Sequence, residues 1–263
     1  MRDIARERAN LMLNKVPQVT LAFWVIKIMS TTVGETGADY LAVHAGLGRA
    51  ITSAIMTALL TAALGWQLLS RRYVPCIYWL TVVLISVVGT QITDALTDGL
   101  EVSLYWSTCA FALLLATIFT LWYRTERTLS IQTIVTTRRE LFYWAAVLFT
   151  FALGTAAGDL ATEALGLGFK LGVVVFGTLI LTMATAYYVS ANAVLTFWLA
   201  YILTRPFGAS LGDLLSQARG YGGFGLGTVY TSIGFLVVIV ALVTFVSIRA
   251  NHAVDAEGVS GPA

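Results

Sequence analysis

The sequence predicts an all-α membrane protein with eight transmembrane helices, arranged as four parallel two-helix repeats with both termini in the cytoplasm. Three observations support this prediction. The chain of 263 residues is 58% hydrophobic and only 11% charged, whereas a soluble domain usually carries about 25% charged residues. Its apolar segments are each close to the ~20 residues that a helix needs to cross a bilayer. A short pattern of three residues also recurs four times along the chain.

The apolar segments are separated by short polar joins, so little chain remains for a soluble domain. They cover residues 19–40, 49–69, 75–97, 104–123, 141–162, 169–190, 192–213 and 226–248. The basic amino-terminal stretch has no short apolar core followed by a cleavage site, so we expect it to be retained as a cytoplasmic arm. We therefore divide the chain into an arm (1–18), a first half (19–123), a cytoplasmic linker (124–140), a second half (141–248) and a cytoplasmic tail (249–263).

The distribution of lysine and arginine predicts the orientation. With the amino terminus inside, most of the 16 basic residues fall on the cytoplasmic side, as the positive-inside rule requires. Only Arg49, Lys170 and Arg219 fall outside, while Lys27 and Arg205 lie within spans. The net charge of +2 therefore reflects membrane topology. We expect the lipid bilayer as a partner and no nucleic acid.

One pattern, W-x9-G-x4-D, organises the four repeats. The copies are Trp24/Gly34/Asp39, Trp79/Gly89/Asp94, Trp144/Gly154/Asp159 and Trp198/Gly208/Asp213. Because each unit contains two spans, successive units enter the membrane from the same side and are parallel repeats. Such units can form a pseudo-fourfold ring or a two-by-two arrangement, and either one gathers the aspartates.

These four segments, together with ERTLSIQTIVTTRRELFYW in the linker, resemble a bacterial membrane protein family. That family has four tandem repeats of unknown function, each with two transmembrane regions and a characteristic tryptophan. The resemblance covers nearly the whole chain and implies an eight-helix protein of the bacterial inner membrane. It implies no activity, so the function must be sought in the residues themselves.

The residue four positions after each repeat glycine is also small or short. These residues are Ala38, Thr93, Gly158 and Gly212. A small-xxx-small face lets two helix backbones approach closely in lipid, so we expect the first helices of the repeats to pack along it. We expect the repeat tryptophans, with Trp66, Trp122, Tyr187 and Tyr188, to serve in packing or in an aromatic belt at the cytoplasmic edge.

The four repeat aspartates are the candidate functional groups. A carboxylate facing lipid costs on the order of 3 kcal/mol or more, so each should face a polar interior, a cation or the water interface. The negative carboxyl ends of four parallel helices lie nearby and also favour positive charge. The candidate cation-binding residues are Asp39, Asp94, Asp159, Asp213, Glu35 and Gln91, and the five carboxylates among them are the candidate metal ligands. The alternative is that the aspartates are hydrated or cap the following loop.

Hard oxygen ligands favour Mn²⁺, Mg²⁺ or Ca²⁺ over copper and zinc. Cys76 and Cys109 stand alone in the sequence and are expected to be small buried side chains. His44 follows Asp39 in the outer loop, where a single histidine is usually solvated and only occasionally a ligand. The sequence requires no resident cofactor, and a divalent cation such as Mn²⁺ or Mg²⁺ is the ligand that it would accommodate best.

Lys27 and Arg205 lie within spans and need a carboxylate, a carbonyl or water as partner. Arg205 also precedes Pro206, which is expected either to break the helix and line a cavity or simply to kink it. A basic residue near carboxylates can be displaced by an incoming metal or proton, so we assign both cations a charge-pairing and gating role.

These features favour a membrane transporter for a small cation, with a hard divalent metal as first choice. The alternatives are an ion channel, a proton-coupled carrier for a small solute, a membrane-embedded enzyme, and a scaffold or sensor that transports nothing. The sequence has no nucleophile elbow and no HExxH motif, so we predict no enzyme activity and no catalytic residues. The glycine-rich stretch at 220–227 follows no strand, which argues against a nucleotide-binding loop.

Overall fold

The computed structural model describes residues 14–39, 48–189 and 191–259, with the backbone alone at Glu35, 37–39 and 249–259. All regular structure in this part of the chain is helical, which confirms the predicted all-α class. The long helices are α2 (Leu21–Asp39), α3 (Arg49–Leu69), α4 (Pro75–Asp94), α5 (Leu104–Glu126), α6 (Thr137–Asp159), α7 (Gly168–Tyr188), α8 (Ala193–Ser216) and α9 (Thr228–Val259). Short helical turns are η2 (Ala95–Gly99), η3 (Ile131–Thr133), η4 (Leu160–Ala164) and η5 (Arg219–Tyr221).

The first helices of the four repeats form an inner ring. Helix α2 contacts α4, α4 contacts α6, α6 contacts α8, and α8 contacts α2. We call these four the ring helices, and we call their two ends the amino end and the carboxyl end of the ring. The ring is the pseudo-fourfold arrangement that parallel repeats permit.

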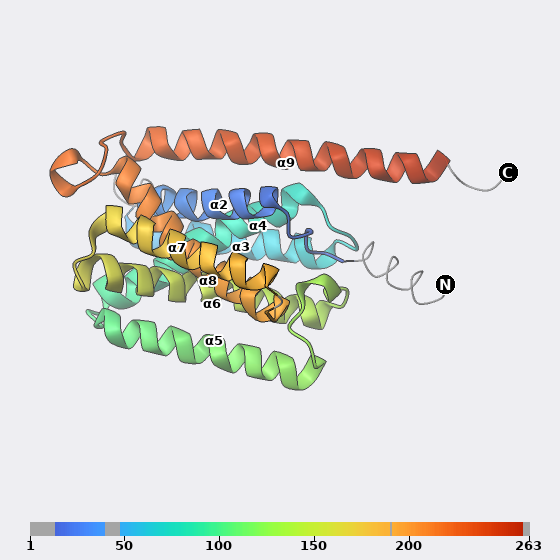
Figure 1. Ribbon diagram of the computed structural model, residues 1–263, viewed down its shortest axis with the longest axis horizontal. Helices are drawn as coiled ribbons and strands as arrows, with labels where there is room; N and C mark the ends of the chain where they lie inside the picture. The colour runs from blue at the N-terminus through green and yellow to red at the C-terminus, as the bar shows by residue number, and fades with distance from the viewer. Residues whose placement is uncertain (1–13, 40–47, 190, 260–263) are drawn as a thin grey trace.

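The second helix of each repeat packs outside the ring, on the ring helix of the following repeat. Helix α3 packs on α4, α5 on α6, and α7 on α8, while α9 returns to pack on α2. Figure 1 shows α9 running along α2 at the edge of the bundle. We call α3, α5, α7 and α9 the outer helices.

Burial separates the two sets of helices. The most apolar stretches of α4, α6 and α8 are 56% to 72% buried, whereas those of the outer helices are 11% to 22% buried. Large apolar side chains such as Leu113, Leu181 and Val237 are exposed on the outer helices. A helix bundle that exposes this much apolar surface needs lipid around it, so the chain is a multi-pass membrane protein.

Helix α2 is enclosed by other helices. Among the residues whose side chains the structure describes, seven helices are long and apolar enough to cross a membrane, and the described part of α2, Leu21–Gly34, is a shorter apolar helix. Ring helices α4 and α8 and outer helix α9 all contact α2. Protein therefore surrounds it and shields its polar residues from lipid.

Three local expectations differ from the structure. Cys76 and Cys109 are exposed, so the prediction that they are buried is wrong. Helix α8 continues through Pro206 as one α-helix, so no broken helix forms at Arg205. Helix α5 extends to Glu126 and α6 begins at Thr137, so the connection between them is shorter than the predicted linker.

Candidate functional site

The four repeat glycines each lie directly against the next ring helix. A Cβ atom added at any one of them would come too close to a side chain there. The contacts are Gly34 with Ser86, Gly89 with Phe151, Gly154 with Arg205, and Gly208 with Thr31. In every case the contacted residue stands three positions before the glycine of its own repeat. Four equivalent close approaches therefore close the ring.

Hydroxyl groups reinforce these approaches. Ser86 Oγ donates to the Ser30 carbonyl at 2.9 Å, which joins α4 to α2. Thr32 Oγ1 donates to the Gly208 carbonyl at 2.9 Å, and Thr93 Oγ1 donates to the Ala152 carbonyl at 3.1 Å. Interhelical hydrogen bonds of this kind stabilise helix pairs in lipid by roughly 0.6 kcal/mol each.

The inward face of each ring helix follows from the register of the repeat. Residues 3, 7, 11 and 15 positions after the tryptophan recur every four residues and so share one helix face. The first layer holds Lys27, Val82, Val147 and Tyr201, all at most 1% exposed. The second layer holds Thr31, Ser86, Phe151 and Arg205, and the third holds Glu35, Thr90, Thr155 and Ala209. The fourth consists of the four repeat aspartates.

Lys27 crosses the ring from α2. Its Nζ atom lies 3.7 Å from the centroid of the Phe151 ring on α6, the helix opposite α2. It also lies 4.2 Å from the centroid of the Tyr201 ring on α8. Desolvated cation–π contacts of this kind contribute about 2 kcal/mol. Among the described residues, these two aromatic faces are the contacts of the ammonium group.

Arg205 crosses the ring from α8. Its Nε atom donates to Thr155 Oγ1 on α6 at 3.1 Å. Its Nη2 atom donates to Thr90 Oγ1 on α4, the helix opposite α8. Both Lys27 and Arg205 are 1% exposed. The middle of the ring is thus filled by two cationic side chains and the aromatic rings beside them.

The described aspartates lie at the carboxyl ends of their ring helices. Asp94, Asp159 and Asp213 are each partly buried, while the side chains of Asp39 and Glu35, and the whole of His44, lie outside the described residues. Within the described part, no three histidine, cysteine, aspartate or glutamate side chains stand close enough to hold a metal ion. The structure therefore places the aspartates around one end of the ring without assembling a metal site from the described ones.

The neutral oxygen donors near the aspartates do not all face the ring. Gln91 is half-buried, and its buried Oε1 atom accepts no hydrogen bond from the described residues. Ser210 lies against α7, because a Cβ added at Gly172 would stand 2.7 Å from Ser210 Oγ. Thr155, in contrast to Ser210, points into the ring, where its hydroxyl oxygen accepts a hydrogen bond from Arg205 Nε.

The repeat tryptophans pack at the amino end of the ring. Trp79, Trp144 and Trp198 are at most 4% exposed and Trp24 is half-buried, so they do not form a lipid-facing belt. They pack with Phe23, Tyr78, Tyr143 and Tyr201 in one aromatic cluster. Trp122 is also fully buried, whereas Trp66, Tyr187 and Tyr188 are exposed as an aromatic belt requires.

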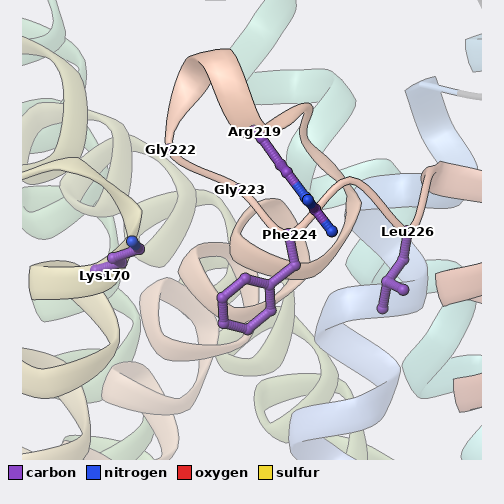
Figure 2. Close-up of a pocket in the computed structure, with 6 residues that line it drawn as sticks. All are labelled: Lys170, Arg219, Gly222, Gly223, Phe224 and Leu226. Carbon is purple, nitrogen blue, oxygen red and sulfur yellow. The ribbon is translucent and has the colours of Figure 1, made fainter.

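A hollow lies away from the ring, in the connection between α8 and α9 (Figure 2). It is open, has a volume of about 520 Å³, and is lined by Lys170 of α7 and by Arg219, Gly222, Gly223, Phe224 and Leu226. Gly222, Gly225 and Gly227 have positive φ angles, so the glycines of this stretch serve its turns.

A family model matches four consecutive segments of the chain, residues 22–73, 77–128, 142–192 and 196–250. Its description is Repeat of Unknown Function (DUF347). The chain belongs to this family. Each DUF347 repeat corresponds to one ring helix followed by one outer helix. Searches of curated proteins and of solved structures found no match.

Two of the four repeats share a further sequence pattern, which begins at the repeat aspartate. The sequence from the aspartate onward is Asp-Ala-Leu-Thr-Asp in repeat two and Asp-Leu-Ala-Thr-Glu in repeat three. In both repeats a π-helical turn, η2 or η4, directly follows the aspartate at the end of the ring helix. Asp98, at the end of the first stretch, bonds Arg49 Nη1 at 2.9 Å and is exposed. A comparison of the residues after each aspartate would have found this pattern.

Proposed function

We propose that this protein transports a small cation across the membrane and that the ring helices are the transport element. One observation carries the proposal. Four parallel helices close into a ring, and each DUF347 repeat has an aspartate at the carboxyl end of its ring helix, at the same end of that ring. A ring of carboxylates at a helix bundle end is a place where a cation gains stabilisation in an otherwise apolar environment.

The chemistry of this end favours a hard cation. The carboxyl ends of the ring helices add the negative ends of four helix dipoles to the aspartates. The next layer inward adds the hydroxyl oxygens of Thr90 and Thr155. Carboxylate and hydroxyl oxygens suit Mn²⁺ and Mg²⁺ better than copper or zinc, so these two ions are the first substrates to test.

Lys27 and Arg205 give the proposed transport a mechanism. A cation that moves inward from the aspartates first meets the guanidinium of Arg205, which is bonded to Thr90 and Thr155 of the third layer, and then the ammonium of Lys27. Because like charges repel strongly in a low dielectric, the two side chains must move before a cation passes. This favours a carrier that changes conformation over an open channel.

One alternative has its own supporting observation. A buried lysine can take up and release a proton during a transport cycle. Lys27, with its ammonium enclosed by the Phe151 and Tyr201 rings, is placed for that role. A proton-coupled carrier for a small solute is therefore the second candidate, and a test with protonophores separates it from proton-independent cation transport.

The direct test replaces Asp39, Asp94, Asp159 and Asp213 singly with asparagine. Purified variants in liposomes are assayed for Mn²⁺ and Mg²⁺ uptake, with folding checked by size-exclusion chromatography. We expect at least about a tenfold loss of uptake in several variants, because each loses a charge in the proposed ion path while keeping its volume. Asp98→Asn is the matched control, since Asp98 is an exposed carboxylate at the same end. Wild-type uptake in all four variants would rule out the aspartate site.

A further inference from the structure

The amino end of the ring contains a buried cage of oxygen atoms around the ammonium group of Lys15. Lys15 Nζ lies 2.6 Å from Glu140 Oε2, and the two side chains are only 8% and 1% exposed. The same Nζ donates to the Leu68 carbonyl oxygen at 3.1 Å. Leu68 stands in the last turn of α3, where carbonyl groups have no partner within the helix and carry the negative end of its dipole.

Gln67 holds the carboxylate of this cage in place. Its Nε2 atom donates to Glu140 Oε1 at 3.1 Å, which fixes the side-chain amide beside the carboxylate. Gln67 is 1% exposed, and its Oε1 atom accepts no hydrogen bond from the described residues. The carboxylate and the carbonyl that the ammonium contacts are hard oxygen ligands of the kind that bind simple cations.

The ammonium enters the cage on a short segment that is not helical. Asn14 Nδ2 donates to the Ile131 carbonyl at 3.2 Å, and Asn14 Oδ1 accepts from the Ile134 amide at 3.1 Å. The Lys15 amide donates to the Ile134 carbonyl at 3.1 Å. We call residues 14–16 the strap. A few exchangeable hydrogen bonds and the side chain of Val16 attach it, so the ammonium can leave without unfolding a helix.

We propose that the cage formed by the Glu140 carboxylate and the Leu68 carbonyl, with Gln67 holding the carboxylate, is a binding site for a monovalent cation, which the ammonium group of Lys15 occupies in this structure. The charge balance selects the class of ion. One buried carboxylate matches one positive charge, whereas a divalent ion would leave an uncompensated charge in a buried position. K⁺ is the first candidate because its size is close to that of an ammonium group.

This inference rests on the proposed function, in which it supplies a second cation site. Glu140 lies in the first turn of α6 and Asp159 ends the same helix, so the two sites are about 28 Å apart at 1.5 Å per residue. Sites at opposite ends of one ring would let a monovalent ion drive or regulate the movement of the substrate cation. Lys15 then acts as a tethered competitor that holds the strap closed when the monovalent ion is scarce.

The first test uses the purified full chain with Lys15→Met. The variant leaves Glu140 buried without its partner, so we expect a lower melting temperature, which K⁺ restores with a saturable dose dependence. The salts are exchanged against choline chloride at constant ionic strength. Wild-type protein should need at least about tenfold more K⁺ for the same stabilisation, because the tethered ammonium competes. The double variant Lys15→Met/Glu140→Gln should not respond to K⁺. Arg49→Gln, which removes an exposed cation, should keep the wild-type K⁺ dependence.

A second measurement needs no destabilised variant. In the wild type, K⁺ that displaces Lys15 should release the strap and raise the hydrogen-exchange rates of the Lys15 and Ile134 amides. Na⁺ and choline serve as comparison ions, and Glu140→Gln should abolish the K⁺ dependence. If melting temperature and exchange are both insensitive to K⁺, Na⁺ and Rb⁺, the cage is only a structural ion pair and the proposal is overturned. The aspartate variants separate the two proposals, since they should lose transport and keep this response.

Discussion

Gly154 of α6 lies so close to Arg205 of α8 that a side chain at position 154 would overlap the Cβ and Cγ atoms of the arginine. The glycine thereby sets the path of the Arg205 side chain, which passes over the α6 backbone to reach Thr155 and Thr90. Packing between two repeats and the position of a buried charge are consequently coupled. A change at one repeat glycine should affect both.

We expect Gly154→Leu and Gly208→Leu to reduce the amount of folded protein. Each substitution inserts a large side chain where a ring contact leaves no space, and overpacking of this kind typically costs about 1–3 kcal/mol or more. The measurement is the monodisperse fraction after size-exclusion chromatography, together with the melting temperature. Gly65→Leu is the matched control, because a Cβ at Gly65 in α3 meets no atom within 4 Å. Equal yields for all three variants would contradict the close-approach interpretation.

The cations in the ring should be needed for transport more than for folding. Arg205→Lys keeps the charge, but a lysine cannot bridge Thr90 and Thr155 with a planar fork, so we expect a partial loss of cation uptake. Arg205→Met and Lys27→Met should lose uptake by at least about tenfold. Lys170→Met provides the comparison, since Lys170 is exposed in the first turn of α7. The gating role would be wrong if Arg205→Met and Lys27→Met folded and transported normally.

The orientation predicted from the basic residues can be tested with single cysteines. In a background of Cys76→Ser and Cys109→Ser, we expect Gln132→Cys to react with an impermeant maleimide only after the cells are permeabilised. Arg219→Cys, at the opposite end of the bundle, should react in intact cells. Both positions are exposed in the structure. The reverse labelling pattern would invert the assignment of the two ends.

Trp198, the tryptophan of the fourth repeat, should stabilise the protein through an indole hydrogen bond that Trp144 of the third repeat does not make with the described residues. Trp198 Nε1 donates to the Leu129 carbonyl at 3.0 Å, whereas Trp144 Nε1 is buried without a partner among the described residues. Trp198→Phe therefore removes a hydrogen bond worth about 1 kcal/mol in addition to packing. Trp144→Phe removes packing alone. Thermal unfolding should show the larger loss for Trp198→Phe, and equal losses would argue against this role of the bond.

The sequence was sufficient to predict the helices and their repetition. Each apolar segment is long and bounded by polar residues, and the constant spacing of Trp79, Gly89 and Asp94 with their equivalents predicts one packing geometry used four times. Hydropathy alone does not distinguish a helix face in contact with lipid from one in contact with protein. Cys76 and Cys109 were misplaced for this reason, and the repeat tryptophans could not be assigned between belt and core.

The site was less predictable because helical phase decides it. Ser210 follows Ala209 by one residue, and that step of about 100° turns its hydroxyl from the ring towards α7. The long side chains of Lys27 and Arg205 reach the opposite helix, so no local sequence spacing reveals their partners. The bond between Lys15 and Glu140 joins positions 125 residues apart, where only the tertiary structure supplies a signal.

Because each outer helix covers the ring helix of the next repeat, the bundle has a single closing seam, at which α9 and α8 meet α2. During synthesis α2 enters the membrane first and must wait for the last repeat before its polar face, with Lys27, is fully enclosed. No repeat is a self-sufficient folding unit, and a chain that lacks the fourth would leave this face open to lipid. We therefore expect the bundle to be complete only when the final helix has packed on α2.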